Sequence, residues 1–104
     1  MGALSISTLT ISPAAVSANT TAEQTFALSG VVAADSMVLA VSKPTAQAGL
    51  GIVGWRVSSD GNIGITFSNN TAGSITPTAS EAYKVAWVRS TAALPKTYQL
   101  ALAT

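Results

Sequence analysis

Apolar and polar residues alternate along most of this chain with a period of two, which is typical of β-strands that bury one face. No segment keeps apolar residues at positions i, i+3, i+4 and i+7 for long, so the pattern predicts no helix longer than about two turns. The alternation predicts seven short strands, near residues 1–11, 25–28, 37–41, 53–58, 63–67, 83–88 and 98–102.

The clearest local signal is the dipeptide Asp60-Gly61, which stands between two alternating runs. Asp-Gly at such a place is typical of a β-hairpin, because both central residues of a type I′ turn need a positive φ. The sequence therefore predicts a two-residue turn flanked by Ser59 and Asn62. The strand before this turn is expected to carry Val53, Trp55 and Val57 on one face.

The first eleven residues change the parity of their apolar positions. Leu4 and Ile6 share one parity, and Leu9 and Ile11 share the other. This change predicts either a bulge or bend near residues 7–8 or two short strands. Residues 1–17 are interpreted as an N-terminal arm, which either pairs within its own sheet or pairs with a neighbouring subunit or a capsid surface.

The length of 104 residues gives room for one domain with one core, so residues 1–104 are interpreted as a single β domain. Short strands separated by turn residues predict an all-β fold. The expected architecture is a single small β-sandwich or Greek-key barrel of about seven short antiparallel strands.

Charged residues make up only 9% of the chain, against 48% hydrophobic residues, and the formal net charge is +1. A typical domain has about a quarter of its residues charged. The surface is therefore expected to be polar but nearly neutral, which lowers the cost of burying it against a neighbour. No apolar run approaches the roughly 20 residues that span a bilayer, so no membrane partner is expected.

The chain has no His and no Cys, which removes the most common general base and the thiolate nucleophile. Its acids are isolated, and a solvated surface is the preferred interpretation for Glu23 and Glu81 over a paired-acid site. Residues 49–54 space glycines like a dinucleotide fingerprint, but they do not lie between a strand and a helix. The prediction is a protein that is not an enzyme, with no catalytic residues, no metal and no cofactor.

The five basic residues are spread along the chain, whereas binding to nucleic acid needs several cations clustered on phosphates. Trp55 beside Arg56, and Trp87 near Arg89, leave a base-stacking platform as an alternative. Both tryptophans stand in alternating strands, so packing in a core or an interface is preferred. No nucleic-acid partner is expected.

Six segments between residues 18 and 83 carry a resemblance to a known group of proteins. They are residues 18–26 (ANTTAEQTF), 41–45 (VSKPT), 48–53 (AGLGIV), 55–58 (WRVS), 65–69 (ITFSN) and 80–83 (SEAY). In these segments the chain resembles small β-rich virion proteins of tailed bacteriophages. This group includes capsid decoration or cement proteins and related head-fibre and knob modules. The resembling stretch, from Asn19 to Arg89, covers roughly two-thirds of the chain.

The resemblance implies a capsid decoration (cement) protein that binds the outer capsid surface and stabilises the head without catalysis. Its partner would be the major capsid protein, and a homo-oligomer is expected, with a trimer as the first expectation. It would be made in the host cytoplasm and located on the outer surface of the virion. The resemblance does not fix the residues that contact the capsid. The interface candidates, taken from the apolar pattern of the arm and from the two tryptophans, are Leu4, Ile6, Leu9, Ile11, Trp55 and Trp87.

An alternative is a phage tail or fibre module that recognises glycans on the host surface. Such a module needs exposed aromatic rings beside polar groups, and the candidates are Trp55, Tyr83, Trp87 and Tyr98. Exposure of the tryptophans separates the two hypotheses. Buried tryptophans with a large apolar surface favour the capsid role, and a row of exposed rings favours glycan recognition.

Overall fold

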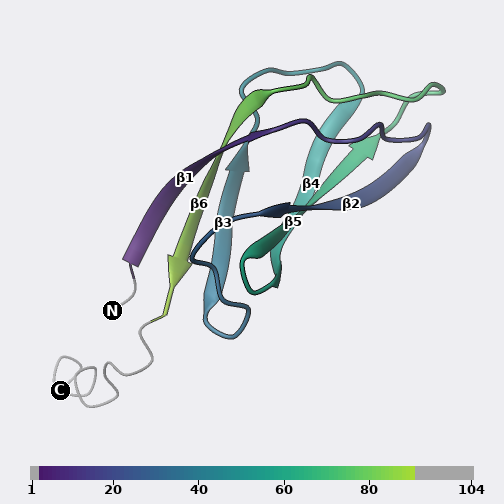
Figure 1. Cartoon of the computed structure of the whole chain (residues 1–104). Helices are drawn as coiled ribbons and strands as arrows, with labels where there is room; N and C mark the ends of the chain where they lie inside the picture. The colour runs from purple at the N-terminus through teal and green to yellow at the C-terminus, as the bar shows by residue number, and fades with distance from the viewer. Residues whose placement is uncertain (1–2, 91–104) are drawn as a thin grey trace, which may run out of the picture.

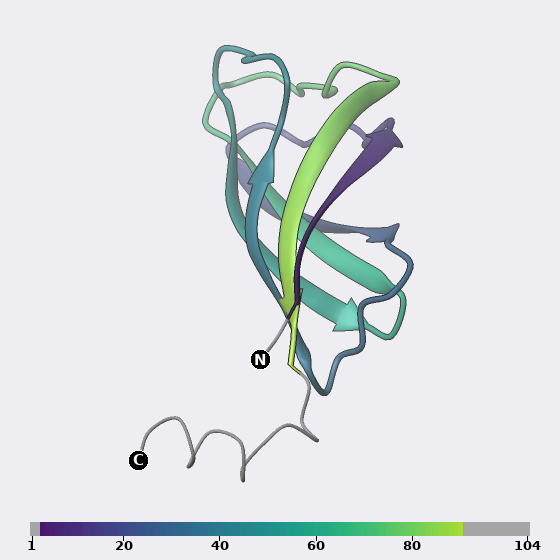
Figure 2. The ribbon, with the colours of Figure 1, turned by 90° about the vertical axis from the view of Figure 1, so that its left-hand side faces the viewer.

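The computed structural model describes residues 3–90, which form six β-strands and no helix (Figure 1). The strands are β1 Ala3–Ile11, β2 Thr20–Ala27, β3 Ser36–Ser42, β4 Leu50–Ser59, β5 Asn62–Asn69 and β6 Glu81–Arg89. They form two three-stranded antiparallel sheets, ordered β1–β6–β3 and β2–β5–β4. The sheets pack together as two layers (Figure 2), so the predicted all-β class is confirmed as a small β-sandwich. The strand expected near residues 98–102 lies outside the described residues.

The connections between strands mostly cross from one sheet to the other. Within residues 3–90, only β4 and β5 follow each other inside one sheet. The strand orders place β5 and β6 at the centres of their sheets, with a partner strand on both edges. Their inner faces lie against each other across the sandwich. This arrangement places the core between strands that are adjacent in sequence but belong to different layers.

The core follows the predicted alternation of β5 and β6. The side chains buried from these strands are Ile63, Ile65 and Phe67 of β5, and Tyr83, Val85 and Trp87 of β6. Each fully buried Ile or Phe stabilises the fold by about 1.5–3 kcal/mol. The same core cluster contains four further buried residues, Val16, Leu28, Val31 and Val38.

The β4–β5 hairpin lies where Asp60-Gly61 predicts it, with Ser59 paired to Asn62. Its turn type differs from the prediction. Gly61 has a φ of +78°, but Asp60 does not have a positive φ, so the turn is not type I′. The turn is held by the loop after β2: the Leu28 amide donates to the Gly61 carbonyl, and the Ala33 amide donates to Asp60 Oδ1 at 2.9 Å.

Two bulges change which residues face the core. In β4 the register shifts between Ile52 and Gly54, so Val53 is 62% exposed and does not share a buried face with Val57 as the alternation predicts. In β3 a similar shift between Val38 and Ala40 leaves Leu39 exposed. A bulge inserts one residue into an edge strand, and the side chains beyond it change face.

The N-terminal stretch is one continuous strand. β1 pairs with β6 without interruption from Ala3 opposite Arg89 to Ile11 opposite Glu81. The predicted bulge, bend or division near residues 7–8 is therefore wrong. Of the two alternatives for the arm, the structure has β1 in its own sheet. The change of parity means instead that the apolar residues of this one regular strand lie on different faces. Leu4 and Ile6 point outward, and Leu9 and Ile11 point inward.

The long connection after β5 is organised by Asn69, which is 1% exposed. Its Nδ2 donates to the Val16 and Gly73 carbonyls, at 3.0 and 2.8 Å. Its Oδ1 accepts from the amide and the hydroxyl of Thr71. A buried amide with all its donors and acceptors paired stabilises an irregular loop without a desolvation penalty.

Candidate interaction surface

The arm residues predicted as interface candidates divide between two faces of β1. Leu4 and Ile6 lie on the outer face of the β1–β6–β3 sheet and are 66% and 68% exposed. Leu9 and Ile11 lie on the inner face, where they are partly buried against the core. Only Leu4 and Ile6 therefore lie on an open surface.

The two tryptophan candidates lie in different sheets. Trp87 is 8% exposed and belongs to the core, whereas Trp55 on β4 is 39% exposed. The indole Nε1 of Trp87 donates a hydrogen bond to Ser7 Oγ at 3.0 Å. Because Ser7 must point inward to accept this bond, Ile6 before it points outward. This contact gives a physical reason for the parity change in β1.

The exposed surface of Leu4 and Ile6 continues across all three strands of the sheet. Paired residues on neighbouring strands point to the same face, so the register defines rows of side chains. Two successive rows contain no polar side chain, and we call them the apolar rows. They are Leu4–Val88–Met37 and Ile6–Ala86–Ala40.

Sequence reasoning missed Met37 and Leu39 as members of this surface. Met37 is 59% exposed and Leu39, the bulged residue beside the apolar rows, is 45% exposed. The alternation groups both with Val41, which is partly buried against the core. Val88 was the sequence signal that could have revealed this surface. It places an apolar residue on the face of β6 opposite to that of Trp87.

The apolar rows occupy only one end of the sheet. The next row along is Thr8–Lys84–Ser42, which is polar. The apolar end is the one where β1 begins and β6 ends, at the lower left of Figure 1. Contiguous exposed apolar surface on a small protein typically marks a site of interaction with another molecule.

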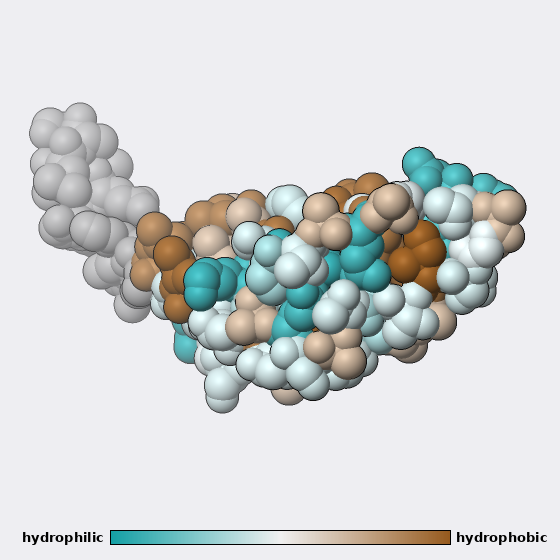
Figure 3. Space-filling model, turned by 90° about the horizontal axis from the view of Figure 1, so that it is seen from above, coloured by the Kyte–Doolittle hydropathy of each residue, from teal (hydrophilic) through white to brown (hydrophobic). Residues whose placement is uncertain are grey.

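Most of the remaining surface is weakly polar. In the view of Figure 3 it is pale, with separate brown and teal patches. Three ion pairs join six of the eight charged side chains in residues 3–90, and the other two are Asp60 and Lys84. The pairs are Lys43–Glu81, Arg56–Glu23 and Arg89–Asp35. The three pairs therefore neutralise most of the charge within the described residues.

The Glu23–Arg56 pair crosses the outer face of the β2–β5–β4 sheet. Arg56 Nε and Nη2 donate to the two Glu23 oxygens at 2.7 and 2.8 Å, and this hydrogen bonding holds the pKa of Glu23 below its ordinary value of 4.5. Gly64 of β5 lies beneath the pair, and a Cβ at this position would overlap the Glu23 carboxylate. Gly64 is thus the residue that lets the pair bridge the two edge strands of this sheet.

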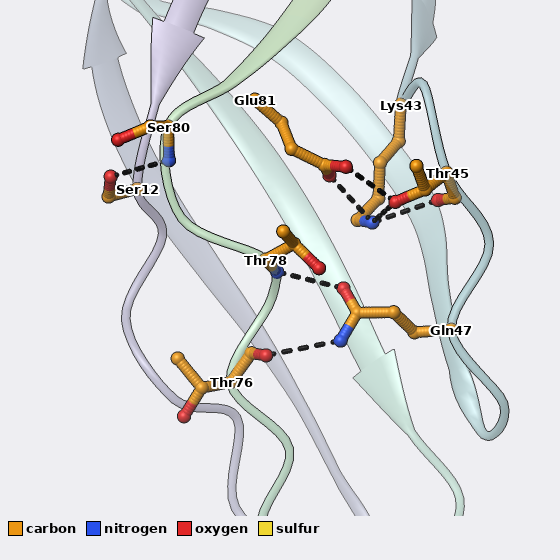
Figure 4. A network of polar contacts seen from close by, with 8 residues as sticks. All are labelled: Ser12, Lys43, Thr45, Gln47, Thr76, Thr78, Ser80 and Glu81. Carbon is orange, nitrogen blue, oxygen red and sulfur yellow. Dashed lines mark hydrogen bonds and ion pairs between the residues drawn. The ribbon is translucent and has the colours of Figure 1, made fainter.

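A second polar network joins the end of β3 to the start of β6 (Figure 4). Lys43 Nζ lies 2.9 Å from Glu81 Oε1, and both side chains are only 10% exposed. Hydrogen bonds from Thr45 and then Lys43 hold the pKa of Glu81 below its ordinary value. Nearby, Gln47 donates to the Thr76 carbonyl at 3.1 Å. These contacts tie the β3–β4 loop to the chain before β6.

The hydroxyl of Tyr83 is buried and has no hydrogen-bond partner among the described residues. Burial, and secondly the negative charge of Glu81, raise the pKa of Tyr83 to about 12. A perturbed tyrosine next to an acid is one of the features that catalytic sites use. Here the side chain is fully buried in the core.

A hollow of about 290 Å³ lies at the start of β4. Its lining consists of Gly49, Leu50, Gly51, Val53, Ser68 and Asn70. Four of these residues belong to the glycine-rich run 49–54, which in the structure leads into and forms the start of strand β4 and is not a loop before a helix. Gly49 has a φ of +81°, and a Cβ there would overlap Thr71, so close approach of two loops explains this glycine.

Within residues 3–90 no group of three or more acidic side chains is close enough to hold a metal ion. Glu23 and Glu81 do not face one cleft, since each is held by a basic partner on its own sheet. No helix in the described part of the chain is long and apolar enough to cross a membrane. Comparison with known proteins finds no matching family model, curated protein or solved structure.

Proposed function

We propose that this chain is a non-catalytic bacteriophage capsid decoration protein that binds the outer capsid surface and stabilises the head. The observation that carries the proposal is the pair of apolar rows on the β1–β6–β3 sheet. Burying apolar surface is favourable by about 25 cal/mol for each Å² removed from water. The rows contain no ionised side chain, so burying them against the major capsid protein desolvates no charge of the rows themselves.

Two further features support a structural role on a particle. The ion pairs and the Asn69 loop tie separate strands together, which favours a stiff domain. The charge-poor surface gives weak self-repulsion, which suits a protein held in an assembly. The same features do not require a cofactor or an active site.

The alternative role, recognition of host glycans by a tail or fibre module, has less support. Of the four aromatic candidates, Tyr83 and Trp87 are buried, and Tyr98 lies outside the described residues. Trp55 is the remaining ring, at 39% exposure. One partly exposed ring is a weak basis for sugar stacking, which uses exposed rings next to polar groups.

The test is rebinding to capsids from which the protein has been stripped, followed by electron cryomicroscopy of the particles. The variant Leu4→Lys/Ile6→Lys places charge in the apolar rows. We expect its capsid affinity to fall at least about 100-fold, which corresponds to roughly 3 kcal/mol. Density on the outer capsid surface for the unaltered chain is the second expected result.

Val53→Lys is the matched control, because Val53 is 62% exposed but lies on the other sheet. It should bind capsids as the unaltered chain does. Equal binding by all three proteins would refute the role of the apolar rows. Density on a tail or fibre instead of the head would replace the decoration role with the alternative.

A further inference from the structure

The four edge strands of the two sheets differ in how their free edges are protected. A strand edge with unpaired N–H and C=O groups pairs readily with another strand unless a bulge, a charge, a proline or a covering segment prevents it. β4 has two register shifts, and β3 has one and is followed by Lys43-Pro44. β3 and β4 also lie against each other at one side of the sandwich.

β2 is protected in another way. It carries Glu23, and the Gln24 side chain binds both backbone groups of Ala14 at 2.8 and 2.9 Å. The segment before β2 is further fixed by the bridge between Val16 and Ile75. The chain that leads into β2 is thus fastened to it.

β1 has none of these protections among the described residues. It is nine residues long, pairs with β6 without a register shift, and contains no charged residue, no glycine and no proline. Its second edge has no partner strand in residues 3–90, and it forms the outer margin of the sheet in Figure 1. The most exposed apolar side chains of this strand are Leu4 and Ile6, both in the apolar rows.

We propose that β1 of a second copy of this chain pairs with this edge in the antiparallel direction, so that two sheets join into one sheet of six strands. A two-fold axis perpendicular to the sheet brings the same edge of both copies together, and two-fold contacts of this kind are the most common among homo-oligomers. β1 carries no charge, so pairing it with an identical strand places no like charges opposite each other. The backbone groups along the edge then gain partners that no strand within residues 3–90 supplies.

The apolar rows favour the antiparallel direction. A two-fold axis perpendicular to the sheet keeps the outer faces of both copies on the same side, so the apolar rows of the two copies adjoin. Parallel pairing of the same two edges needs an axis along the strands, which turns one copy over and puts its apolar rows on the opposite side. Antiparallel pairing is also slightly more stable per residue. The antiparallel direction is thus the one that joins the rows into a single surface.

The alternation of faces restricts the register of this pairing. Paired residues on neighbouring strands point to the same face, so the axis must pass through a residue and not between two. With the axis at Ser5, Leu4 of each copy lies opposite Ile6 of the other, and both joined rows are apolar throughout. With the axis at Ile6 or Ser7, Leu4 lies opposite a threonine, and an axis nearer either end of β1 leaves fewer paired residues. The proposal therefore places Ser5 on the axis.

The two-fold pair closes after two copies, so this inference gives a dimer, whereas the resemblance to virion proteins implies a trimer. The joined sheet makes each apolar row twice as long. Binding to a capsid is no part of this argument, and the experiments below include no capsid. Their outcome therefore does not depend on the proposed function.

The first experiment measures mass by light scattering at submillimolar concentration. The intact chain should have twice its chain mass of 10.4 kDa. Leu4→Lys/Ile6→Lys should be monomeric, because a new lysine of one copy lies directly opposite a new lysine of the other. Leu4→Lys/Ile6→Glu is the matched control. It removes the same two apolar side chains but places each new lysine opposite a new glutamate, so it should remain dimeric.

Three results of this measurement would overturn the proposal. A monomeric intact chain would mean that a second copy does not fill the edge of β1. A trimeric intact chain would contradict the two-fold pair. Equal masses for the two variants would contradict the pairing of position 4 with position 6.

The second experiment locates the axis. The chain has no cysteine, so a single Ser5→Cys substitution forms a disulfide only between two copies. Paired residues of antiparallel strands have Cα atoms about 4.5–5.5 Å apart, within the range of about 4.4–6.8 Å that a disulfide needs. With oxidised glutathione as the oxidant, we expect Ser5→Cys to give a disulfide-linked dimer. In the control Thr8→Cys the two cysteines would lie roughly 20 Å apart along the strands, so little dimer should form. Equal yields from the two variants would show that Ser5 is not on the axis.

Discussion

The outer faces of the two sheets differ in a way that shows how one small protein separates stability from interaction. On the β2–β5–β4 sheet the outward rows are Thr21–Ser68–Gly51, Glu23–Thr66–Gly54 and Thr25–Gly64–Arg56. These side chains are small, polar or joined in an ion pair. On the β1–β6–β3 sheet two rows are wholly apolar. The polar face of the β2–β5–β4 sheet is suited to contact with water. The apolar rows of the β1–β6–β3 sheet are stabilised further only when another surface covers them.

The largest effect on stability is expected beneath the apolar face, at Tyr83. Because its folded pKa is raised to about 12 from 10.0, the folded state keeps its proton more tightly than the unfolded state. The stabilisation of the folded state by protonated Tyr83 is therefore fully present below pH 10. It is lost as the pH rises to about 12. The loss should amount to roughly 3 kcal/mol in denaturant unfolding measured across this window. Tyr83→Phe should remove the pH dependence; if it does not, Tyr83 is not its source.

The polar sheet should be most sensitive at its hairpin. Gly61→Val is expected to destabilise by about 1–2 kcal/mol, since a β-branched residue does not adopt a positive φ easily. No atom lies within 4 Å of a Cβ at Gly61, so the effect comes from the backbone alone. Gly51→Val is the control, because the space is equally open and no positive φ is required. Equal denaturation midpoints for the two variants would contradict this explanation.

The inner contact that turns Leu4 and Ile6 outward should have a smaller effect. Ser7→Ala leaves the Trp87 indole N–H without its acceptor, which should cost about 1 kcal/mol. In a Trp87→Phe background the same substitution should cost almost nothing. Thermal unfolding of the four proteins measures this coupling, and equal losses in both backgrounds would mean that the hydrogen bond is not responsible.

The smallest effect is expected for the ion pair on the polar face. Glu23→Gln should weaken stability slightly at low salt and not at high salt, because the pair is exposed and screened. In a Gly64→Ala background, where the methyl group displaces the carboxylate, the substitution should have no effect. A loss of stability on Glu23→Gln that is the same in both backgrounds would show that Gly64 does not make room for the pair.

Acid should weaken the Lys43–Glu81 ion pair and so lower the stability of the fold. The pKa of Glu81 is lowered in the folded state, so its contribution is present above pH 4.5 and is lost as the pH falls through the lower folded value. Glu81→Gln should therefore flatten the acid side of the stability curve. An unchanged acid slope, measured by urea unfolding between neutral and acid pH, would assign the loss to other carboxylates.

The sequence by itself determined the strands and their main turn. Period-two alternation and turn residues are local properties, so the all-β class and the hairpin at Asp60-Gly61 follow from short stretches of chain. The same local pattern groups Leu4 with Ile6 and Leu9 with Ile11. It does not state which pair is covered, because that depends on the strand and the layer that each residue meets.

The tertiary structure alone decided which face of each strand is buried. The bulges that expose Leu39 and Val53 arise from pairing with β6 and β5, whose register no local pattern contains. Ser7 turns inward because Trp87, eighty residues away, needs an acceptor there. Asn69 and Gly64 have their roles through partners on other strands or loops. Long-range contacts of this kind set the apolar rows, and with them the surface on which the proposed interactions depend.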